Sequence, residues 1–307
     1  MSILVVGTVA FDSVETPFGS RDQVLGGSGS YLATAASFYG PARVVSVIGE
    51  DFPEEHLETF RSRGIDTDGI ERVAGGKTFF WRGRYDENLN VAHTLDTQLN
   101  VLADFDPKLP AHYRDAKFVA LGNFAPELQL QVLNQLDKPT LVAADTMNFW
   151  IEGSNAALRQ TLARVDLLSI NDGEARMLSG EYNLRLAAKK IRAMGPKILV
   201  IKRGEYGALL FVEDEIFAAP AYPLEVIRDP TGAGDTFAGG MMGFLARQER
   251  VDVASLRQSI IVGSAMASFV VEDFSLDRMA TLEKGEVASR FKEFDHLTRF
   301  DSEGLAF

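Results

Sequence analysis

Short runs of apolar residues alternate with amphipathic stretches along most of the chain, which is the pattern of successive βαβ units. The first run, Ile3–Val6, is apolar at every position and stops at Gly7, as a strand buried on both faces does. A helical stretch over 30–39 follows, and a second apolar run covers 43–48. The alternation predicts an α/β fold with a mostly parallel central sheet that is covered by helices on both faces.

The same pattern predicts the remaining elements of the main sheet and its helices. Further strands are expected at 118–121, 140–144, 167–170 and 198–201. Further helices are expected at 53–63, 126–136, 154–162, 184–194, 234–246, 253–271 and 283–295. Two apolar runs at 206–212 and 216–219 are separated by three acidic residues and predict an antiparallel hairpin late in the sheet.

Two stretches depart from this rhythm. Residues 78–85 are aromatic and partly alternating, and a second strand-like run near 91–95 follows them after a polar turn. We expect the segments 11–26 and 77–97 to form a small β lid beside the main sheet; the alternative is two more strands in the core. No internal repeat or long polar linker divides the sequence, so a single domain over 1–307 is expected.

Composition and charge exclude several classes of protein. With 46% hydrophobic and 24% charged residues, the chain is neither collagen-like nor wholly disordered, and without cysteine it has no disulfide or thiolate chemistry. A net charge of −12 disfavours nucleic acid and anionic membranes as main partners. The longest apolar runs, 3–6 and 237–246, are shorter than the roughly 18 residues of a membrane span. No signal-peptide pattern is present, so a cytoplasmic protein is expected.

The segment 229–240, Asp-Pro-Thr-Gly-Ala-Gly-Asp-Thr-Phe-Ala-Gly-Gly, carries the clearest chemistry. Gly232 and Gly234 permit a tight turn directly before a helix, whose first N–H groups are then free to bind an anion. Asp235 places a carboxylate beside that anion, which suits a general base acting on a nucleophile near a phosphoryl group. On spacing alone, the alternative is a glycine turn with Asp235 as a helix cap.

At this segment the chain resembles the ribokinase (PfkB-type) family of carbohydrate and nucleoside kinases, whose C-terminal signature it matches nearly letter for letter. The other motifs occur in the family's order along the whole chain: Gly7 followed by Asp12, the Gly26–Gly29 turn before a helix, Asn171–Glu174, and Lys202–Gly207. The resemblance implies a three-layer, ribokinase-like α/β/α fold. It also implies an ATP-dependent carbohydrate kinase that transfers a phosphoryl group to an alcohol.

The resemblance also implies roles for individual residues on the acceptor side. Asp235 would be the general base, and Asp12 would bind a substrate hydroxyl. Gly26 and Gly27 would allow the substrate to approach the backbone, although a plain helix-entry turn has the same pattern. The anion hole would be formed by the backbone N–H groups of Gly232, Ala233, Gly234 and Asp235.

On the nucleotide side, the resemblance implies that Glu174 orients Mg²⁺ through water and that Asn171 lies near the phosphates. Without the resemblance, these two residues are a helix-capping pair. Asp229 matches a position that in some members helps to hold a monovalent cation such as K⁺, and a turn-forming role before Pro230 is the alternative. The residues lining the nucleotide would be Lys202, Gly204, Gly207 and Thr231.

Tyr31 departs from the pattern of many sugar-specific members, which carry an asparagine at the matching position. An aromatic side chain there either stacks on a ring of the substrate or packs in the helix. The expected activity is phosphorylation of a primary hydroxyl of a small sugar. The alternatives are a nucleoside kinase, which Tyr31 and the aromatic lid would suit, and a catalytically silent sugar- or nucleotide-binding regulator. Pairing of two copies through the lid is a candidate assembly.

Overall fold

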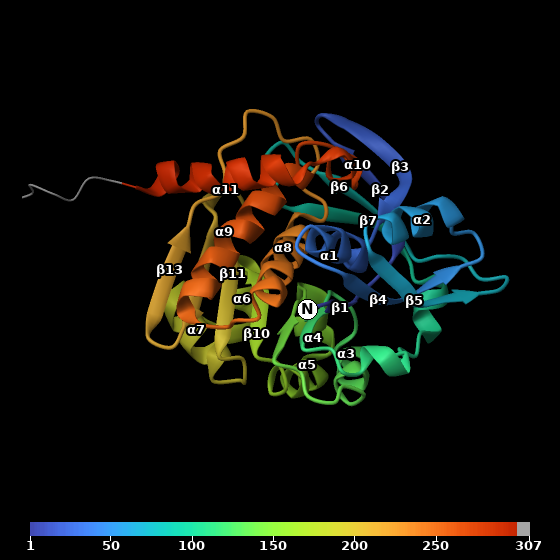
Figure 1. The fold of residues 1–307 in the computed structure, drawn as a ribbon, viewed down its shortest axis with the longest axis horizontal. Coiled ribbons are helices and arrows are strands. Elements are labelled where there is room, and N and C mark those ends of the chain that lie inside the picture. The colour runs from blue at the N-terminus through green and yellow to red at the C-terminus, as the bar shows by residue number, and fades with distance from the viewer. Residues whose placement is uncertain (300–307) are drawn as a thin grey trace, which may run out of the picture.

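The computed structural model describes residues 1–299, and its largest feature is a nine-stranded sheet (Figure 1). In sheet order, its strands are β13 (Glu215–Ala219), β12 (Ala208–Val212), β11 (Ile198–Lys202), β10 (Leu167–Asn171), β9 (Leu141–Ala144), β8 (Phe118–Leu121), β1 (Ile3–Val6), β4 (Ala42–Gly49) and β5 (Ile65–Val73). The strands from β11 to β5 run parallel, and β12 and β13 add the predicted antiparallel hairpin at one edge.

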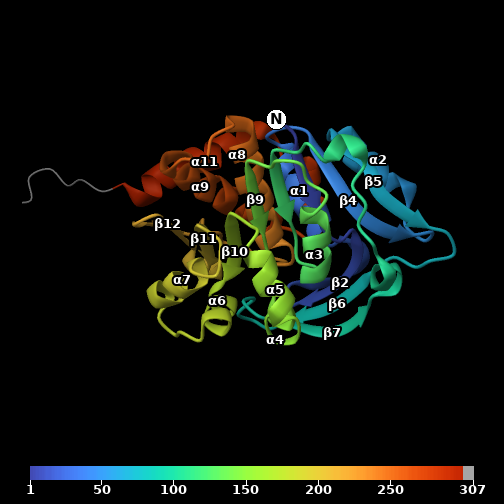
Figure 2. The same cartoon turned by 90° about the horizontal axis from the view of Figure 1, so that it is seen from below.

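Helices cover both faces of this sheet (Figure 2). One face carries α1 (Ser28–Ser37), α2 (Glu54–Ser62), α8 (Ala233–Gln248), α9 (Val253–Val270), α10 (Asp277–Thr281) and α11 (Lys284–Thr298). The other face carries α3 (Pro126–Leu133), α4 (Asn148–Gly153), α5 (Asn155–Leu162), α6 (Asp172–Ser179) and α7 (Leu184–Arg192). Short 3₁₀ helices are η1 (Asn100–Asp104), η2 (Ala111–Tyr113) and η3 (Gly204–Tyr206). The predicted three-layer α/β/α fold is confirmed.

The central strand β1 divides its side chains between two hydrophobic cores. Ile3 and Val5 face the core under α1, α8 and α9, whereas Leu4 and Val6 face the core under α3, α5 and α7. Successive side chains of a strand point to opposite faces, so a strand covered on both sides needs apolar residues at every position. This requirement explains the unbroken apolar run that begins the sequence.

Helices α1 and α8 are packed unusually closely, because α8 presents glycines to its neighbour. A Cβ atom at Gly239 would lie 2.3 Å from the carbonyl oxygen of Leu32, and one at Gly243 would lie 2.8 Å from the Cα atom of Ala36. Any side chain at either glycine would push the two helices apart. The small residues of α8 therefore fix the position of α8 against α1 along most of their length.

Helix α9 is a core helix of the same layer. Its 18 residues are long and apolar enough to cross a membrane by length and composition, but 67% of them are buried inside the protein. It packs against α8 and α11 and contributes large apolar side chains such as Met266 and Phe269 to the core. Its apolar character is accounted for by this burial.

A second sheet stands beside the first and is called the small sheet below. In sheet order it consists of β3 (Gly19–Gly26), β2 (Ala10–Thr16), β6 (Phe80–Tyr85) and β7 (Ala92–Gln98). Strand β2 pairs antiparallel with β3 and parallel with β6, and β6 pairs antiparallel with β7. The two segments expected to form the lid thus build a sheet of their own. The alternative, in which they add two more strands to the core, was wrong.

Strand β5 was not predicted from the sequence. It reads Ile-Asp-Thr-Asp-Gly-Ile-Glu-Arg-Val and pairs with the main sheet only through β4. Because β5 is at the edge, most of its side chains are partly or fully exposed and the run lacks the continuous apolar character of the inner strands. Periodicity therefore gave little signal for a strand at these residues.

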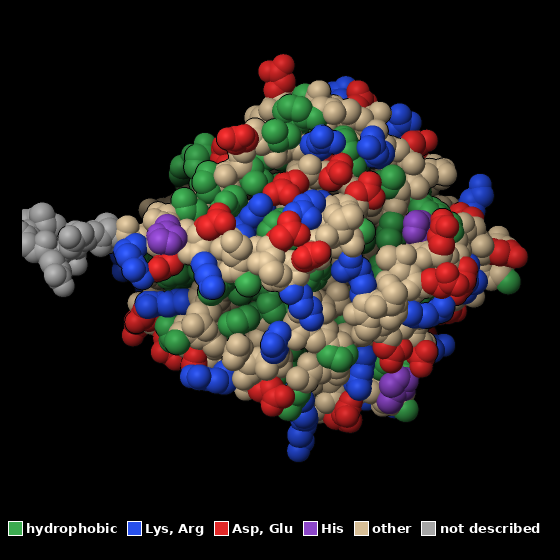
Figure 3. Space-filling model, turned by 45° about the horizontal axis from the view of Figure 1, so that its top comes forward, with side chains coloured by type: hydrophobic (Ala, Val, Ile, Leu, Met, Phe, Trp, Pro, Cys, Tyr) green, Lys and Arg blue, Asp and Glu red, His purple; other side chains and the backbone are tan. Residues whose placement is uncertain are grey.

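The surface of the described residues carries both signs of charge. On the face that Figure 3 shows, Lys and Arg side chains are interspersed with Asp and Glu side chains. No continuous basic stripe crosses that face of residues 1–299, as a surface for a nucleic-acid backbone would require.

Candidate active site

The candidate residues of the sequence come together at one edge of the main sheet. Asp145 follows β9, Asn171 ends β10, Lys202 ends β11, and all three lie at the carboxyl ends of parallel strands. The start of α8 approaches the same edge, because a Cβ atom at Gly234 would lie 3.0 Å from the Lys202 Nζ atom. In open α/β sheets this edge is where ligands bind.

The turn into α8 leaves several backbone donors free. Gly232 has a φ of 74°, and a Cβ atom there would lie 2.4 Å from the ring of Tyr31, so the position requires glycine. Within residues 1–299, the N–H groups of Gly232, Gly234 and Asp235 have no acceptor. The N–H group of Ala233 donates to the carbonyl of Pro230 at 3.1 Å. Three of the four expected donors are thus available to an anion in this structure.

Asp235 stands in the first turn of α8 beside these donors. Burial raises the pKa of its carboxyl to about 7, the nearby Asp145 carboxylate adds to the rise, and the Lys202 ammonium opposes it. A general base is most effective when its pKa is close to the working pH. The environment of Asp235 therefore suits a residue that takes up and releases a proton near neutrality.

Lys202 and Asp145 form a buried ion pair close to Asp235. The Lys202 Nζ atom lies 2.9 Å from the Asp145 Oδ2 atom, and the two side chains are 17% and 12% exposed. Burial lowers the pKa of Lys202, but Asp145, Glu174 and Asp235 together raise it above its ordinary value, so the ammonium stays charged. The sequence placed Lys202 along the nucleotide; the structure brings it to the anion site itself.

Asn171 and Glu174 form a reciprocal cap at the start of α6. The Asn171 Oδ1 atom accepts from the Glu174 N–H group at 2.8 Å, and the Glu174 Oε2 atom accepts from the Asn171 N–H group at 2.8 Å. Burial raises the pKa of Glu174 to about 7, and the nearby Asp145 carboxylate contributes to the rise. The structure thus contains the helix cap that the sequence alone also allowed for this pair. The cap holds the Glu174 side chain close to Asp145.

These carboxylates also suit a divalent cation. The Oε1 atom of Glu174 has no hydrogen-bond partner among the described residues, and Asp145 lies close enough to raise its pKa. Carboxylate oxygens are the protein ligands that Mg²⁺ prefers, and Mg²⁺ commonly binds through one or two of them together with substrate phosphates. The donor set therefore fits the metal that the resemblance implies.

Asp12, on strand β2 of the small sheet, also lies near the α8 turn, because the Asp229 and Asp235 carboxylates both influence its pKa. Its side chain is 5% exposed, and its Oδ2 atom accepts a hydrogen bond from the Gly27 N–H group at 3.4 Å. A Cβ atom at Gly26 would lie 2.0 Å from the same oxygen, so only glycine allows Asp12 this position. Burial raises the pKa of Asp12 to about 7, with smaller contributions from the Asp229 and Asp235 carboxylates. Asp12 and Asp235 therefore belong to one acidic site.

Tyr31 lies beneath this site rather than open to it. Its ring packs against Gly232, its side chain is buried, and its hydroxyl has no hydrogen-bond partner within residues 1–299. Burial raises the pKa of Tyr31, and the Asp12 carboxylate raises it further. The sequence allowed Tyr31 either to stack on a ring of the substrate or to pack in the helix. In the structure its ring is packed inside the protein, and its hydroxyl has no partner among the described residues.

The small sheet reaches the site through its strand β6 and the following turn. The Thr231 hydroxyl donates to the Tyr85 hydroxyl at 3.3 Å, while the Thr231 N–H group donates to the Asp229 Oδ1 atom at 2.8 Å. Farther along, Asn90 donates to Glu205 of η3 at 3.4 Å. The sequence named the aromatic lid as a cover for the substrate, but nothing in the sequence indicated which aromatic residue reaches the α8 turn.

Trp81, Gly204 and Gly207 make their contacts with the small sheet and with the segments around β12 and β13. The Trp81 indole covers Gly83 and donates to Thr94 at 3.1 Å on the small sheet. A Cβ atom at Gly204 would lie 2.7 Å from the Asn90 side-chain oxygen, and one at Gly207 would lie 2.0 Å from the carbonyl of Ala219. Both glycines have positive φ angles, as the turn from β11 to β12 requires.

The three carboxyl groups whose pKa is raised to about 7 predict how stability depends on pH. In the unfolded chain, Asp and Glu ionise near their ordinary pKa of about 4, so between about pH 4 and 7 the folded protein holds more protons. Stability should therefore fall as the pH rises through this range. We expect the melting temperature to decline from about pH 5 to about pH 8, and to decline less in Asp12→Asn, which cannot ionise.

Calorimetric melting curves of both proteins across this range test the expectation. Asp214→Asn, a change at an exposed aspartate of the β12–β13 turn, is the matched control and should follow the parent. Parallel pH curves for the parent and Asp12→Asn would contradict a buried carboxyl that ionises only near neutrality.

Comparison with known families agrees with the geometry. Residues 3–281 match the family described as pfkB family carbohydrate kinase. This chain belongs to the PfkB family. The resemblance inferred from its motifs is confirmed, and the protein is a kinase that transfers a phosphoryl group to an alcohol group of a sugar or nucleoside. A catalytically silent regulator is thereby set aside.

Curated relatives of this PfkB-family kinase include nucleoside kinases. It is 33% identical over 253 residues to a cytidine kinase of Thermococcus kodakarensis, covering 80% of this chain and 89% of that protein. It is 26% identical to a nucleoside kinase of Methanothermobacter thermautotrophicus, covering 94% of this chain and 95% of that protein.

Solved structures of the same fold superpose over nearly the whole kinase. The Burkholderia thailandensis nucleoside kinase in complex with inosine matches with a TM-score of 0.77 at 18% identity, covering 95% of this chain and 98% of that one. A putative ribokinase II of Escherichia coli in complex with ATP and Mg²⁺ matches with a TM-score of 0.78 at 17% identity, covering 95% and 99%. At these identities the likeness shows the shared ribokinase-like fold.

Proposed function

We propose that this PfkB-family kinase phosphorylates the primary hydroxyl of a nucleoside, with Mg²⁺ and ATP as the phosphoryl donor system. The observation that supports this reaction is the position of Asp235. Its carboxyl has a pKa of about 7 and lies in the first turn of α8, where N–H groups are free to bind an anion. The sequence favoured a small sugar as the acceptor and kept the nucleoside as the alternative. The similarity to a cytidine kinase over 80% of the chain supports the nucleoside instead.

In the proposed reaction, the nucleoside donates a hydrogen bond to Asp12, which holds the primary hydroxyl of the nucleoside near Asp235. The Asp235 carboxylate takes the hydroxyl proton while the hydroxyl oxygen forms a bond to the γ-phosphorus of ATP. The bond from that phosphorus to the bridging oxygen breaks, and ADP leaves. The free N–H groups of Gly232, Gly234 and Asp235 stabilise the charge on the transferring group.

Three charged residues support this step from the nucleotide side. The Lys202 ammonium lies against the α8 turn and adds positive charge there, and Asp145 holds it in place at 2.9 Å. Glu174 and Asp145 are the carboxylates that would hold Mg²⁺, which would supply positive charge to the phosphates. Asn171 fixes the Glu174 side chain through the reciprocal cap.

Several remaining expectations are also part of this proposal. We propose that residues 1–307 act as one kinase domain in the cytoplasm and that a monovalent cation such as K⁺ binds near the buried Asp229. We also propose that Lys202, Gly204, Gly207 and Thr231 border the nucleotide, with the small sheet as a lid. Strand β7 is an exposed edge strand, which supports pairing of two copies through the small sheet.

A panel of acceptors tests the substrate class. With ATP, Mg²⁺ and K⁺ present, we expect kcat/KM for at least one of cytidine, uridine, inosine and adenosine to exceed the values for ribose and fructose by about tenfold or more. ADP release measures turnover, and phosphorus NMR identifies the phosphorylated hydroxyl. If a sugar were turned over faster than every nucleoside, the acceptor would be a sugar and the nucleoside proposal would be wrong. Phosphate on a secondary hydroxyl would contradict the primary-hydroxyl assignment.

A further inference from the structure

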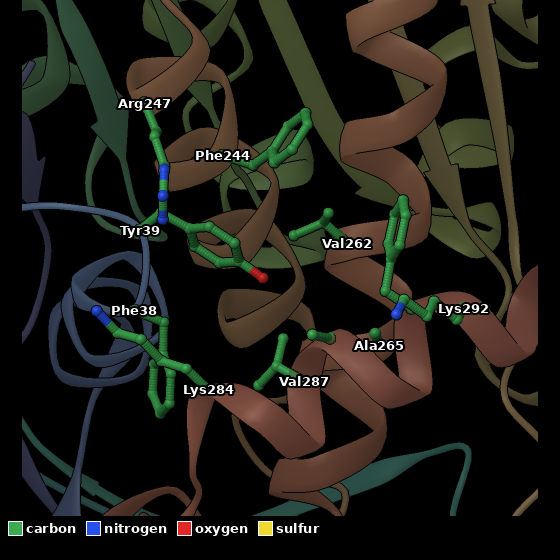
Figure 4. Close-up of a pocket in the computed structure, with 11 residues that line it drawn as sticks. Phe38, Tyr39, Phe244, Arg247, Val262, Ala265, Lys284, Val287 and Lys292 are labelled. Carbon is green, nitrogen blue, oxygen red and sulfur yellow. The ribbon is translucent and has the colours of Figure 1, made fainter.

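A cavity of about 350 Å³ lies on the helical layer of the kinase, away from the active site (Figure 4). Its walls come from the residues that follow α1, the last turns of α8, the middle of α9 and the first half of α11. Its volume is at the lower end of the range of about 300–1,000 Å³ that is usual for small-molecule sites.

The walls of the cavity are almost wholly apolar. Phe38, Phe244, Val262, Val287 and Phe291 line it, and Ala265 and Ala288 complete the wall. Such a surface offers little to a sugar or a nucleotide, because polar hydroxyl and phosphate groups would lose their hydrogen bonds to water there. An occupant must therefore have an apolar body.

Three cationic side chains border the cavity. Arg247, Lys284 and Lys292 line it, and none of them has an ion-pair partner within residues 1–299. Among residues 1–299, no acidic residue lines the cavity. In a protein with a net charge of −12, three unpaired cations around one apolar cavity favour an anion and repel a cation.

A free hydroxyl inside the cavity marks the position of a polar group on the occupant. Tyr39 points its hydroxyl into the space between Val262 and Val287 (Figure 4). That hydroxyl is buried and has no hydrogen-bond partner among the described residues, and its ring packs edge-to-face on Phe244 at 6.2 Å. A buried hydroxyl left without a partner is unfavourable, and an oxygen of a bound ligand would satisfy it.

We propose that this cavity binds a small amphipathic carboxylate, such as a medium-chain fatty acid. Its apolar body lies between Phe244, Val262 and Val287. Its carboxylate accepts a hydrogen bond from the Tyr39 hydroxyl and is neutralised by Arg247, with Lys284 and Lys292 at the two sides of the opening. The site does not depend on the acceptor of the kinase reaction, so it can be tested separately from the proposed function.

Binding of octanoate to the full chain, followed by isothermal titration calorimetry, tests the proposal. Octylammonium and octanol are the probes with a cationic and a neutral head group, respectively. We expect octanoate to bind and octylammonium not to bind, with octanol weaker than octanoate. Equal binding of octylammonium and octanoate, or no binding of octanoate, would overturn the proposal.

Two kinds of variant locate the binding. Arg247→Gln removes a charged partner of the carboxylate and should weaken octanoate binding by about 10- to 150-fold. Ala288→Phe places a ring at an exposed wall position of the cavity and should abolish binding without altering the core. The matched control is Lys189→Gln, at an exposed position of α7, which should bind octanoate as the parent does.

The same variants distinguish other occupants of the cavity. Unchanged octanoate binding in both Arg247→Gln and Ala288→Phe would place the ligand elsewhere and overturn the proposal. If the cavity were instead covered by a second copy of the chain, Ala288→Phe would change the oligomeric state on gel filtration while the parent failed to bind octanoate. That result would likewise overturn it.

Discussion

Asp235→Asn should lower kcat by at least about 100-fold, because general-base catalysis contributes roughly 10²–10⁴-fold and asparagine cannot accept the proton. The parent carboxyl has a pKa of about 7, so its activity should also fall as the pH drops below neutrality. The pH dependence of kcat/KM reports the ionisation of the free enzyme, and the part of this acid limb that Asp235 contributes should disappear in the variant. ATP affinity should hold or rise slightly, since a negative charge beside the phosphates is removed.

Folding should survive this substitution. Asparagine has nearly the size of aspartate and is about as good a residue at a helix start. Asp277→Asn, a change in the first turn of α10 and exposed to solvent, is a matched control that should leave turnover unchanged. The decisive measurement is kcat of each purified variant beside its melting curve. Turnover of Asp235→Asn within about tenfold of the parent would remove Asp235 from the role of base.

Asp12→Ala should raise KM for the acceptor by about 10- to 150-fold and change KM for ATP little, because a hydrogen bond to a charged group contributes roughly 1.5–3 kcal/mol. Asp12 lies on the small-sheet side of the α8 turn, against Gly26 and Gly27, whereas Glu174 and Lys202 lie at the carboxyl ends of the main strands. The substitution should therefore change KM for the acceptor without changing KM for ATP to the same extent.

Glu15→Ala is the control for this experiment, because Glu15 is on the same strand, β2, and is exposed. It should leave both KM values unchanged. Asp12→Asn retains an oxygen that can accept from Gly27 and should therefore lie between the parent and Asp12→Ala. A rise in KM for ATP with an unchanged acceptor KM would move Asp12 to the nucleotide side of the site.

Local patterns were sufficient for every strand of the main sheet except β5, for most of the helices and for the helix start at Asp235, whereas the short helices α4 and α10 were not predicted. Each inner strand is covered on both faces, so its apolar run is continuous and visible in the sequence, as at 3–6. The tight turn at Gly232 is equally local, because its φ of 74° favours glycine. Strand β5 was missed because an exposed edge strand has no such requirement.

The contacts that complete the site join residues far apart in the chain, and no local pattern encodes them. The pair of Asp145 and Lys202, and the contact of Tyr85 with Thr231, depend on how strands and sheets are arranged in space. The apolar cavity has walls from helices α8, α9 and α11 and from the residues that follow α1, none of which has an unusual sequence. These features became visible only when the packing of the elements was known.

The raised pKa values have a further consequence for calorimetry of this kinase. Asp12, Glu174 and Asp235 each have a pKa of about 7, so each is partly protonated in neutral buffer. A ligand that brings positive charge to these carboxyls lowers their pKa values and releases protons into solution. The buffer takes up those protons, and its own heat of ionisation is added to the heat of binding. Binding enthalpies measured in different buffers will therefore differ, and only their extrapolation to zero buffer heat describes the contacts in the site.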